Sequence, residues 1–228
     1  MYTIVIDAGH GGYDPGAVFG TRKEKDDNLR LALAVQRRLE KQNVIMTRST
    51  DVLVPLYQRS TIANQSNADI FVSIHRNASQ SSSANGMENY VHTTAPETDV
   101  LYAQNVLREI VKAGVQTNRG VIRANFSVLR HTLAPAMLLE IGFITNARDN
   151  QLFDQNFDAY AAAIAHGIME SLQGPPFLPP QYFFYTVESG DSMWGIAQRF
   201  GVAIDTIVSL NSLTNDTVTV RQVIKIPV

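Results

Sequence analysis

The chain has 228 residues, of which 45% are hydrophobic and 18% charged, a composition that can build a hydrophobic core. The formal net charge is −2 and no basic run is visible, which argues against a protein that binds nucleic acid by neutralising phosphates. The absence of cysteine excludes disulfides, cysteine-based zinc sites and thiol nucleophiles, and no apolar stretch approaches the roughly 20 residues that span a bilayer.

Strand-like and helix-like segments alternate over most of the chain, which predicts an α/β fold with a twisted, largely parallel central sheet flanked by helices. The expected strands are residues 2–7, 43–49, 68–75, 86–92 and 135–143, and the expected helices are residues 27–42, 56–67, 98–114 and 149–172. In the first helix, Leu31, Val35 and Leu39 recur at helical spacing and form an apolar stripe.

A proline-rich segment marks a domain boundary. QGPPFLPPQ, residues 173–181, contains four prolines and a glycine. Each proline restricts its own backbone and that of the preceding residue, so the segment reads as an extended, semi-rigid linker. We therefore expect a domain at 1–172, a linker at 173–184 and a small domain at 185–228.

The small domain is expected to fold as a βααβ unit. Its expected elements are a strand at 185–187, a helix from Trp194 to Phe200, a helix at about 203–210 and a closing strand at 223–228. The spacing of Trp194 to Ala197 and Phe200 places the tryptophan in the core of this domain in preference to a sugar-stacking position.

The stretch IVIDAGHGGYDPGA, residues 4–17, contains four glycines at the end of the first strand. A dinucleotide-binding loop needs the pattern GxGxxG, but Asp14 stands where the third glycine belongs, and the lysine of a phosphate-binding loop is also missing. The glycines are instead expected to turn the backbone sharply around His10.

Two histidines lie where predicted strands end. His10 follows the first strand and His75 ends the third. Because the carboxyl ends of parallel strands form the ligand-binding crevice of open α/β sheets, both side chains are expected at that edge. Glu24, in the loop before the first helix, completes a candidate set of two histidines and one carboxylate, which would leave an open position on a catalytic zinc ion.

These residues also have a simpler interpretation. Each histidine could be a hydrogen-bonded loop residue, and Glu24 could belong to a solvated, helix-capping charge cluster. Asp26 or Asp27 suits the cap better, which leaves Glu24 free for a ligand role.

Glu140 lies within PAMLLEIGF, an otherwise apolar strand. An unpaired carboxylate is costly to bury, so either a cation partners it or a raised pKa makes it useful for proton transfer. Asp7, directly before the glycines, is a candidate acceptor for the ring N–H of a histidine ligand.

Five motifs follow one another along the chain: IVIDAGHGGYDPGA, EKDDNL, SIHRNA, GMENYV and VLRHTLAPAMLLEIGFITN. They resemble the zinc-dependent N-acetylmuramoyl-L-alanine amidases of the amidase 3 type over residues 1–172. The resemblance implies one Zn²⁺ ion held by His10, Glu24 and His75, with Glu140 as the catalytic glutamate. Asn77, in the SIHxNA pattern, would support the loop or bind the substrate. Arg76 departs from that pattern, since smaller or polar residues are more usual there; as a basic residue beside the site it would either contact a stem-peptide carboxylate or, as we favour, cover the rim of the site.

The small domain is similar to LysM domains, on the segments YTVESGDSMWGIAQRFGV and LNSLTNDTVTVRQVIKIP. The resemblance implies a groove for N-acetylglucosamine chains between two loops, lined by Gly190, Asp191, Ser192, Met193, Asn215, Asp216, Thr217 and Val218. Arg221 stands where a turn glycine is usual, so the local backbone is expected to differ if that glycine requires a positive φ.

Together, the resemblances imply a peptidoglycan hydrolase that cleaves the bond between N-acetylmuramic acid and L-alanine and is targeted to the cell wall by LysM. Its partner would be bacterial peptidoglycan, with no nucleic acid, membrane span or obligate protein partner. No secretory signal is evident at MYTIVIDAG, so action outside the cytoplasm would need lysis, a holin or a removed signal.

Two alternatives from other classes stay open at this stage. One is a glycan-binding protein whose amidase fold is inactive, against which the intact set of His10, Glu24, His75 and Glu140 argues. The other is a zinc peptidase that cuts elsewhere in the stem peptide.

Overall fold

The computed structural model describes residues 1–174, 182–211 and 213–227. The chain divides into two compact units, residues 1–175 and 176–228, and each is described by itself. Most of the predicted linker, residues 175–181, lies outside the described residues. Gln173 belongs to a helix of the first unit, and residues 182–184 belong to a strand of the second. The predicted linker, residues 173–184, therefore includes residues of both units at its two ends.

The first unit contains a six-stranded sheet. In spatial order its strands are β4 (Asn43–Met46), β1 (Thr3–Ala8), β5 (Ile70–Asn77), β8 (Ala136–Phe143), β6 (Met87–His92) and β7 (Asn118–Ala124). Every neighbouring pair is parallel except β6 and β8, which are antiparallel. The predicted largely parallel sheet is confirmed.

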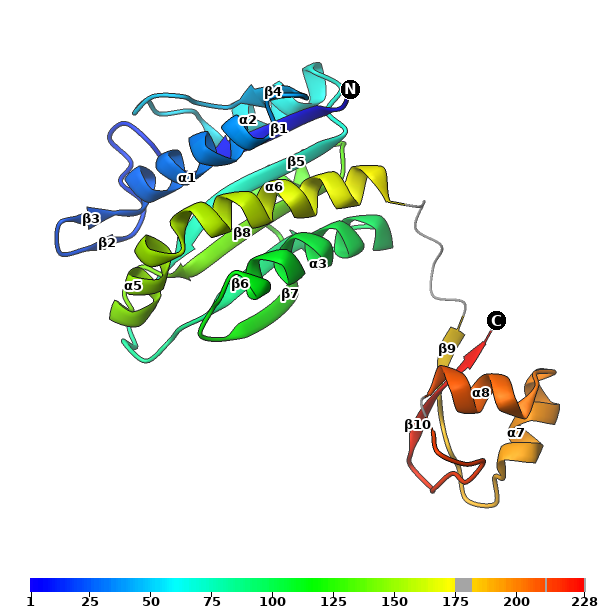
Figure 1. The fold of residues 1–228 in the computed structure, drawn as a ribbon. Coiled ribbons are helices and arrows are strands. Elements are labelled where there is room, and N and C mark those ends of the chain that lie inside the picture. Colours follow the sequence, from blue (N-terminus) through cyan, green and yellow to red (C-terminus); the bar gives the residue numbers. More distant parts are fainter. Residues whose placement is uncertain (175–181, 212, 228) are drawn as a thin grey trace. The chain divides into compact units, whose positions relative to one another are not determined.

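Helices cover both faces of this sheet. The long helices α1 (Glu24–Arg38), α3 (Glu97–Lys112) and α6 (Phe157–Gln173) pack over one face, where Figure 1 shows them side by side. The shorter helices α2 (Leu56–Gln65) and α4 (Ser127–Arg130) pack on the opposite face. A further helix, α5 (Ala147–Gln155), and a small hairpin of β2 (Val18–Phe19) and β3 (Arg22–Lys23) complete the unit.

Several elements differ from the sequence-based expectations, and α4 and the β2–β3 hairpin were not expected at all. The first helix begins at Glu24, so Glu24 is not in a loop, and Lys23 occupies the N-cap position instead of Asp26 or Asp27. The helix expected at 149–172 is two helices, α5 and α6, which meet at Asn156. Strand β7 was not predicted, because an edge strand with the sequence NRGVIRA has no fully buried residue and lacks clean apolar alternation.

Two candidate site residues, His75 of β5 and Glu140 of β8, point to the sheet face that α2 and α4 cover. On that face the core contains Val5, Phe71 and Leu138, one from each of β1, β5 and β8. Because side chains alternate with a period of two, His75 lies on the same face as Phe71, and Glu140 on the same face as Leu138. On this face the apolar core residues are followed, toward the carboxyl ends of the strands, by the polar residues of the candidate site.

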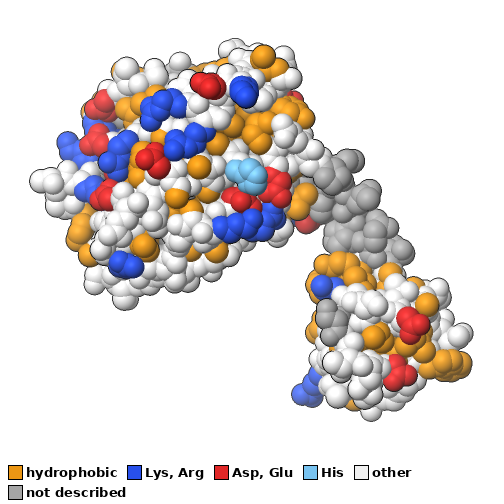
Figure 2. Space-filling view, viewed as in Figure 1, with side chains coloured by type: hydrophobic (Ala, Val, Ile, Leu, Met, Phe, Trp, Pro, Cys, Tyr) orange, Lys and Arg blue, Asp and Glu red, His pale blue; other side chains and the backbone are white. Residues whose placement is uncertain are grey.

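Acidic and basic side chains are interspersed over the surface of the first unit that Figure 2 shows, with no broad basic patch on that face. Among the described residues, no helix combines the length and apolar character that crossing a bilayer requires.

The second unit is a βααβ fold, as predicted. Its elements are β9 (Tyr182–Thr186), α7 (Met193–Phe200), α8 (Ile204–Leu210) and β10 (Val223–Pro227), with β9 and β10 antiparallel. Its core consists of Val187, Met193, Ile196, Ala197, Ile207, Ile224 and Ile226.

Two expectations about the second unit can be corrected or completed. Trp194 is 66% exposed, so the core position predicted for it is wrong; Ile196 and Ala197 fill the core from the same helix. Arg221 has a φ of 71°, so the backbone conformation that suits glycine is kept by a residue with a side chain, at some conformational cost.

Candidate functional site

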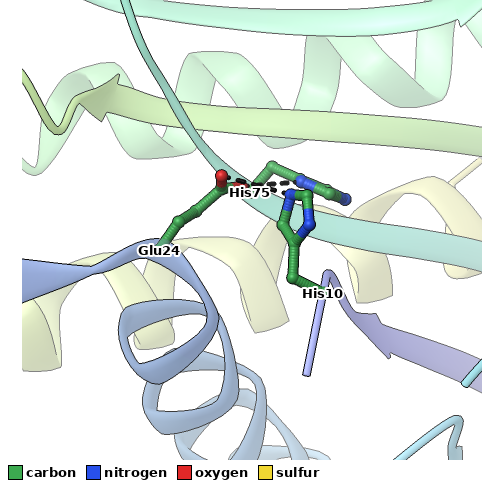
Figure 3. Close-up of side chains that lie close together, drawn as sticks. All are labelled: His10, Glu24 and His75. Atoms are coloured by element: carbon green, nitrogen blue, oxygen red, sulfur yellow. Dashed lines mark hydrogen bonds and ion pairs between the residues drawn. The ribbon is translucent and has the colours of Figure 1, made fainter. Parts of the chain in front are cut away.

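The side chains of His10, Glu24 and His75 converge on one point (Figure 3). The Nε2 atom of His10 lies 3.2 Å from Glu24 Oε2, and Nδ1 of His75 lies 2.8 Å from Glu24 Oε1. One ligand-type atom from each residue falls within 4.8 Å of the others. The structure thus brings together the three residues expected to bind a metal ion.

Two glycines make this convergence possible. A Cβ atom on Gly9 would lie 2.2 Å from the His75 ring, and one on Gly16 would lie 2.5 Å from Glu24 Oε2 and 2.6 Å from the His10 ring. Since such distances are far inside van der Waals contact, only glycine fits at these positions. The glycine cluster therefore serves close packing of the candidate ligands, as the sequence suggested for His10.

Asp14 orients the His10 ring. Its Oδ2 atom lies 2.8 Å from Nδ1 of His10, which leaves Nε2 of His10 to face Glu24. The role expected for Asp7 is wrong, because Asp7 bonds to Arg59, not to a histidine ring. Sequence reasoning missed Asp14, although its place four residues after His10 in the glycine-rich turn was a usable signal.

Glu24 is held as an ionised acceptor. Its side chain is 5% exposed, and its oxygens accept hydrogen bonds from the backbone amides of Ala17 at 2.8 Å and Arg76 at 3.2 Å. Burial alone would raise the pKa of Glu24, but the hydrogen bonds and charges of His10 and His75 outweigh it and hold the pKa far below its usual value. The carboxylate is therefore available to a cation over the whole physiological pH range.

The pKa of His10 is raised in the same cluster. Burial would lower it, but the hydrogen bonds and negative charges of Glu24 and Asp14 have the larger combined effect. A cation that binds here must therefore displace a proton from His10 when the pH is low.

Glu140 lies next to this cluster on the same face of the sheet. It pairs in register with His75 of β5 on one side and with Glu88 of β6 on the other. Its Oε2 atom is buried and has no hydrogen-bond partner in the protein. Burial, followed by the negative charges of Glu24 and Glu88, raises the pKa of Glu140 well above its usual value. The carboxyl group is thus poised to hold a proton.

Glu88 anchors a hydrogen-bond network beside Glu140. Its Oε2 atom accepts bonds from Asn77 Nδ2 at 2.7 Å and from the Tyr90 hydroxyl at 2.6 Å, and its Oε1 atom pairs with Arg119. The Asn77 amide is therefore directed at Glu88, which favours a supporting role for Asn77. Sequence reasoning did not single out Glu88; a carboxylate on the inward face of the alternating segment GMENYV was the available signal.

The expectation for Arg76 is wrong. Its side chain is 1% exposed, so it neither covers a rim nor reaches a ligand. Its guanidinium donates to Asp27 at 2.6 Å and to Asn150 at 2.7 Å, and it lies over the Phe153 ring. Arg76 directly follows His75 in β5, so its side chain points to the opposite face of the sheet, away from the site.

A cavity of about 550 Å³ contains the cluster. Polar groups from His10, Glu24, His75 and Glu140 line it, together with two apolar segments that form part of its wall. One wall is residues 53–56, ahead of and within the start of α2, and the other is residues 126–128 at α4. The cavity can admit a ligand that offers both polar and apolar groups.

The residues fit a zinc ion. Two imidazoles and one carboxylate are the donor set of a catalytic zinc site with an open position, and the Gly9 and Gly16 cradles allow all three to approach one point. A second group of ligand-type side chains, Glu109, His166 and Glu170, lies on α3 and α6, but Arg108 and Lys112 already pair with its carboxylates.

The loops expected to bind glycan in the second unit are mostly exposed. Met193 is the exception: it is 3% exposed and packs in the core, so its assignment to the groove is wrong. Ser192 caps α7 through Gly195, and the Asp191 carboxylate is held by the Tyr185 hydroxyl at 2.6 Å. Gly190 and residues 215–217 are exposed, and Val218 packs partly against the core.

Two family profiles match the chain. The N-acetylmuramoyl-L-alanine amidase family matches residues 4–172, and the LysM domain matches residues 185–227. Among characterised relatives, the N-acetylmuramoyl-L-alanine amidase CwlM of Bacillus licheniformis is 39% identical over 171 residues, which are 73% of this chain and 66% of CwlM. LytH of Staphylococcus aureus, named a probable cell wall amidase, is 41% identical over 155 residues, 66% of this chain and 50% of LytH. The chain thus spans half to two thirds of the length of these relatives.

Solved structures give the same result. The catalytic domain of CwlV, an N-acetylmuramoyl-L-alanine amidase from Bacillus (Paenibacillus) polymyxa var. colistinus, has a TM-score of 0.71 and 41% identity, and the match covers 77% of this chain and 100% of that domain. An N-acetylmuramoyl-L-alanine amidase from Clostridium difficile 630 has a TM-score of 0.73 and 36% identity over 76% of this chain and 97% of its own. The resemblance seen in the motifs is confirmed.

Proposed function

Because the chain belongs to the N-acetylmuramoyl-L-alanine amidase family and carries a C-terminal LysM domain, we propose that it hydrolyses peptidoglycan. The bond cleaved is the amide between the lactyl group of N-acetylmuramic acid and the L-alanine of the stem peptide. One observation carries the proposal: a single cavity holds His10, Glu24 and His75 together with the buried carboxyl group of Glu140.

His10, Glu24 and His75 are the residues that would hold a zinc ion. When bound, zinc supplies Lewis acidity, which polarises the scissile carbonyl and lowers the pKa of water toward about 7. Asp14 keeps the Nδ1 side of His10 occupied, and the missing side chain at Gly9 leaves room for the His75 ring. The Asp14 contact orients the His10 imidazole before any ligand arrives, which reduces the reorganisation needed at that residue on binding.

Glu140 moves the proton. Its carboxylate accepts a proton from the attacking water as the C–O bond forms, and it delivers that proton to the alanine nitrogen as the C–N bond breaks. A raised pKa suits the second half of this cycle, because it makes the Glu140 carboxyl a stronger base that retains the proton until the alanine nitrogen takes it. Glu88 and its partners fix the neighbouring strand, so the Glu140 side chain is offered from a rigid sheet.

The apolar walls suit the groups that flank this amide. The lactyl group and L-alanine each carry a methyl group, and both would lie between residues 53–56 and 126–128. The second unit would bind the N-acetylglucosamine of the glycan through Gly190, Asp191, Ser192 and residues 215–218, and raise the local concentration of the enzyme on the wall. The protein would therefore act outside the cytoplasm, on the cell wall.

The deciding assay measures new L-alanine amino termini released from purified peptidoglycan by the zinc-loaded protein. We expect release by the wild type and a loss of about 100- to 10,000-fold for Glu140→Gln with zinc still bound. A Glu140→Gln variant with full turnover would refute the proton-transfer role. Mass analysis separates the alternatives, since split stem peptides would indicate a peptidase, and binding to the wall without any release would indicate a glycan-binding protein.

The role of the second unit has its own test. The two units have separate hydrophobic cores, so removal of residues 175–228 leaves the core of the first unit complete. We expect this truncation to weaken binding to insoluble wall and to spare the hydrolysis of soluble muropeptide. Equal wall binding by both forms would contradict a targeting role for LysM.

A further inference from the structure

The backbone at His10 has an unfavourable conformation. His10 has a φ of 60°, in the left-handed region that residues with a side chain rarely adopt, and Gly11 and Gly12 also have positive φ angles. Such a conformation persists only where the surroundings impose it. Some contact must therefore hold the turn that aims the His10 ring.

Arg59 of α2 supplies that contact. Its Nη2 atom donates to the carbonyl oxygen of His10 at 2.9 Å, and its Nη1 atom donates to the carbonyl oxygen of Ala8 at 2.7 Å. These two bonds bracket Gly9, whose own carbonyl is bound by Arg48 at 2.9 Å. The end of β1 is thus held from the α2 side by a planar, five-donor group that no other side-chain type can replace.

Arg59 is itself fixed in place. Its side chain is 3% exposed and pairs with the fully buried Asp7 at 2.7 Å. The Asp7 carboxylate also accepts hydrogen bonds from the hydroxyls of Thr47 and Ser73, each at 2.6 Å. Because Arg59 and Asp7 are both buried, the guanidinium has little freedom to move.

The same guanidinium also reaches the wall of the cavity. Its Nε atom donates to the carbonyl oxygen of Val54 at 2.9 Å, in the apolar wall of residues 53–56. One buried side chain therefore joins a candidate metal ligand to a surface that would contact substrate.

We propose that Arg59 is a positioning residue that holds His10 in its metal-binding conformation and ties it to the apolar wall of the cavity. The inference rests on the proposed metal site and goes beyond it, since Arg59 is not one of the three candidate ligands. Lysine in its place would keep the charge beside Asp7 but could not span the carbonyls of Ala8, His10 and Val54 at once.

The test compares Arg59→Lys with Thr47→Val in the full chain. Thr47→Val removes one hydrogen bond to the same Asp7 carboxylate and leaves all four bonds of Arg59 in place, so it serves as a control for loss of stability. Each protein is stripped of metal, its thermal unfolding is followed by circular dichroism, and zinc is titrated against a competing chelator.

We expect both variants to unfold at lower temperature than the wild type, but only Arg59→Lys to lose zinc affinity, by about 10- to 100-fold. Equal zinc affinity in Arg59→Lys and wild type would overturn the inference, as would an equal loss in Thr47→Val. A wild type that binds no zinc would instead overturn the proposed metal site. If Arg59→Lys shows no cooperative unfolding, Asp7→Asn replaces it, with the same expected loss and the same refuting result.

Discussion

Replacement of Glu140 by glutamine should stabilise the metal-free protein although it greatly lowers turnover. Glutamine has nearly the same shape as glutamate but carries no charge at any pH. In the folded protein, burial and the negative charges of Glu24 and Glu88 raise the pKa of Glu140. The folded state therefore favours the neutral form, which glutamine imitates.

The sign of the pH dependence follows from linkage. A carboxyl group whose pKa is raised by folding contributes its stability below the unfolded-state pKa of about 4.3, and that contribution is lost as the pH rises through the folded-state pKa. Glu140→Gln should thus match the wild type near pH 4 and exceed it increasingly at higher pH. Because Oε2 of Glu140 is buried without a partner, we expect a difference of about 1–3 kcal/mol in the free energy of unfolding at pH 8.

The measurement can separate the two units. The chain has a single tryptophan, Trp194, which lies in the second unit, so tryptophan fluorescence reports on the LysM domain. Circular dichroism or calorimetry of the metal-free chain then follows the first unit. We expect only the transition of the first unit to move. A Glu140→Gln variant no more stable than wild type at pH 8 would show that the carboxylate has a compensating partner and would refute the reasoning.

Other changes test single contacts. Gly9→Ala should displace the His75 ring, because the added Cβ would lie 2.2 Å from it, and zinc affinity should fall by about 10- to 100-fold in a chelator titration; unchanged affinity would contradict this packing role. Arg76→Met should destabilise the fold by about 3 kcal/mol in urea unfolding, because it breaks a buried pair with Asp27; a loss under about 1 kcal/mol would place the arginine at the surface. Trp194→Ala should change the stability of the second unit by less than about 1 kcal/mol, measured by calorimetry, and a loss typical of a core aromatic, about 3–5 kcal/mol, would restore the core assignment.

Much of the site could be predicted from the sequence. Apolar runs alternating with amphipathic segments indicate a parallel sheet, and parallel strands bring their carboxyl ends to one edge, so His10 and His75 were expected together. Glu140 could be identified because a carboxylate within an apolar strand must have either a partner or a function. These inferences hold because strand periodicity and the cost of burying charge act over short stretches of chain.

Other features depended on contacts between distant segments. The alternation of β5 turned Arg76 to the opposite face from His75, where Asp27 of α1 receives it, and no local pattern reveals that partner. Trp194 lies at the surface because Ile196 and Ala197 already fill the small core, a matter of packing geometry that residue spacing alone cannot decide.

The sequence by itself determined the fold class, the βααβ unit and the residues that converge on the candidate metal site. Only the tertiary structure decided which side chains support those residues. Asp14 and Arg59 act on His10 through hydrogen bonds made across a turn and between a helix and a strand end. Such bonds depend on the direction of individual donors and acceptors in space, which periodicity and composition do not specify.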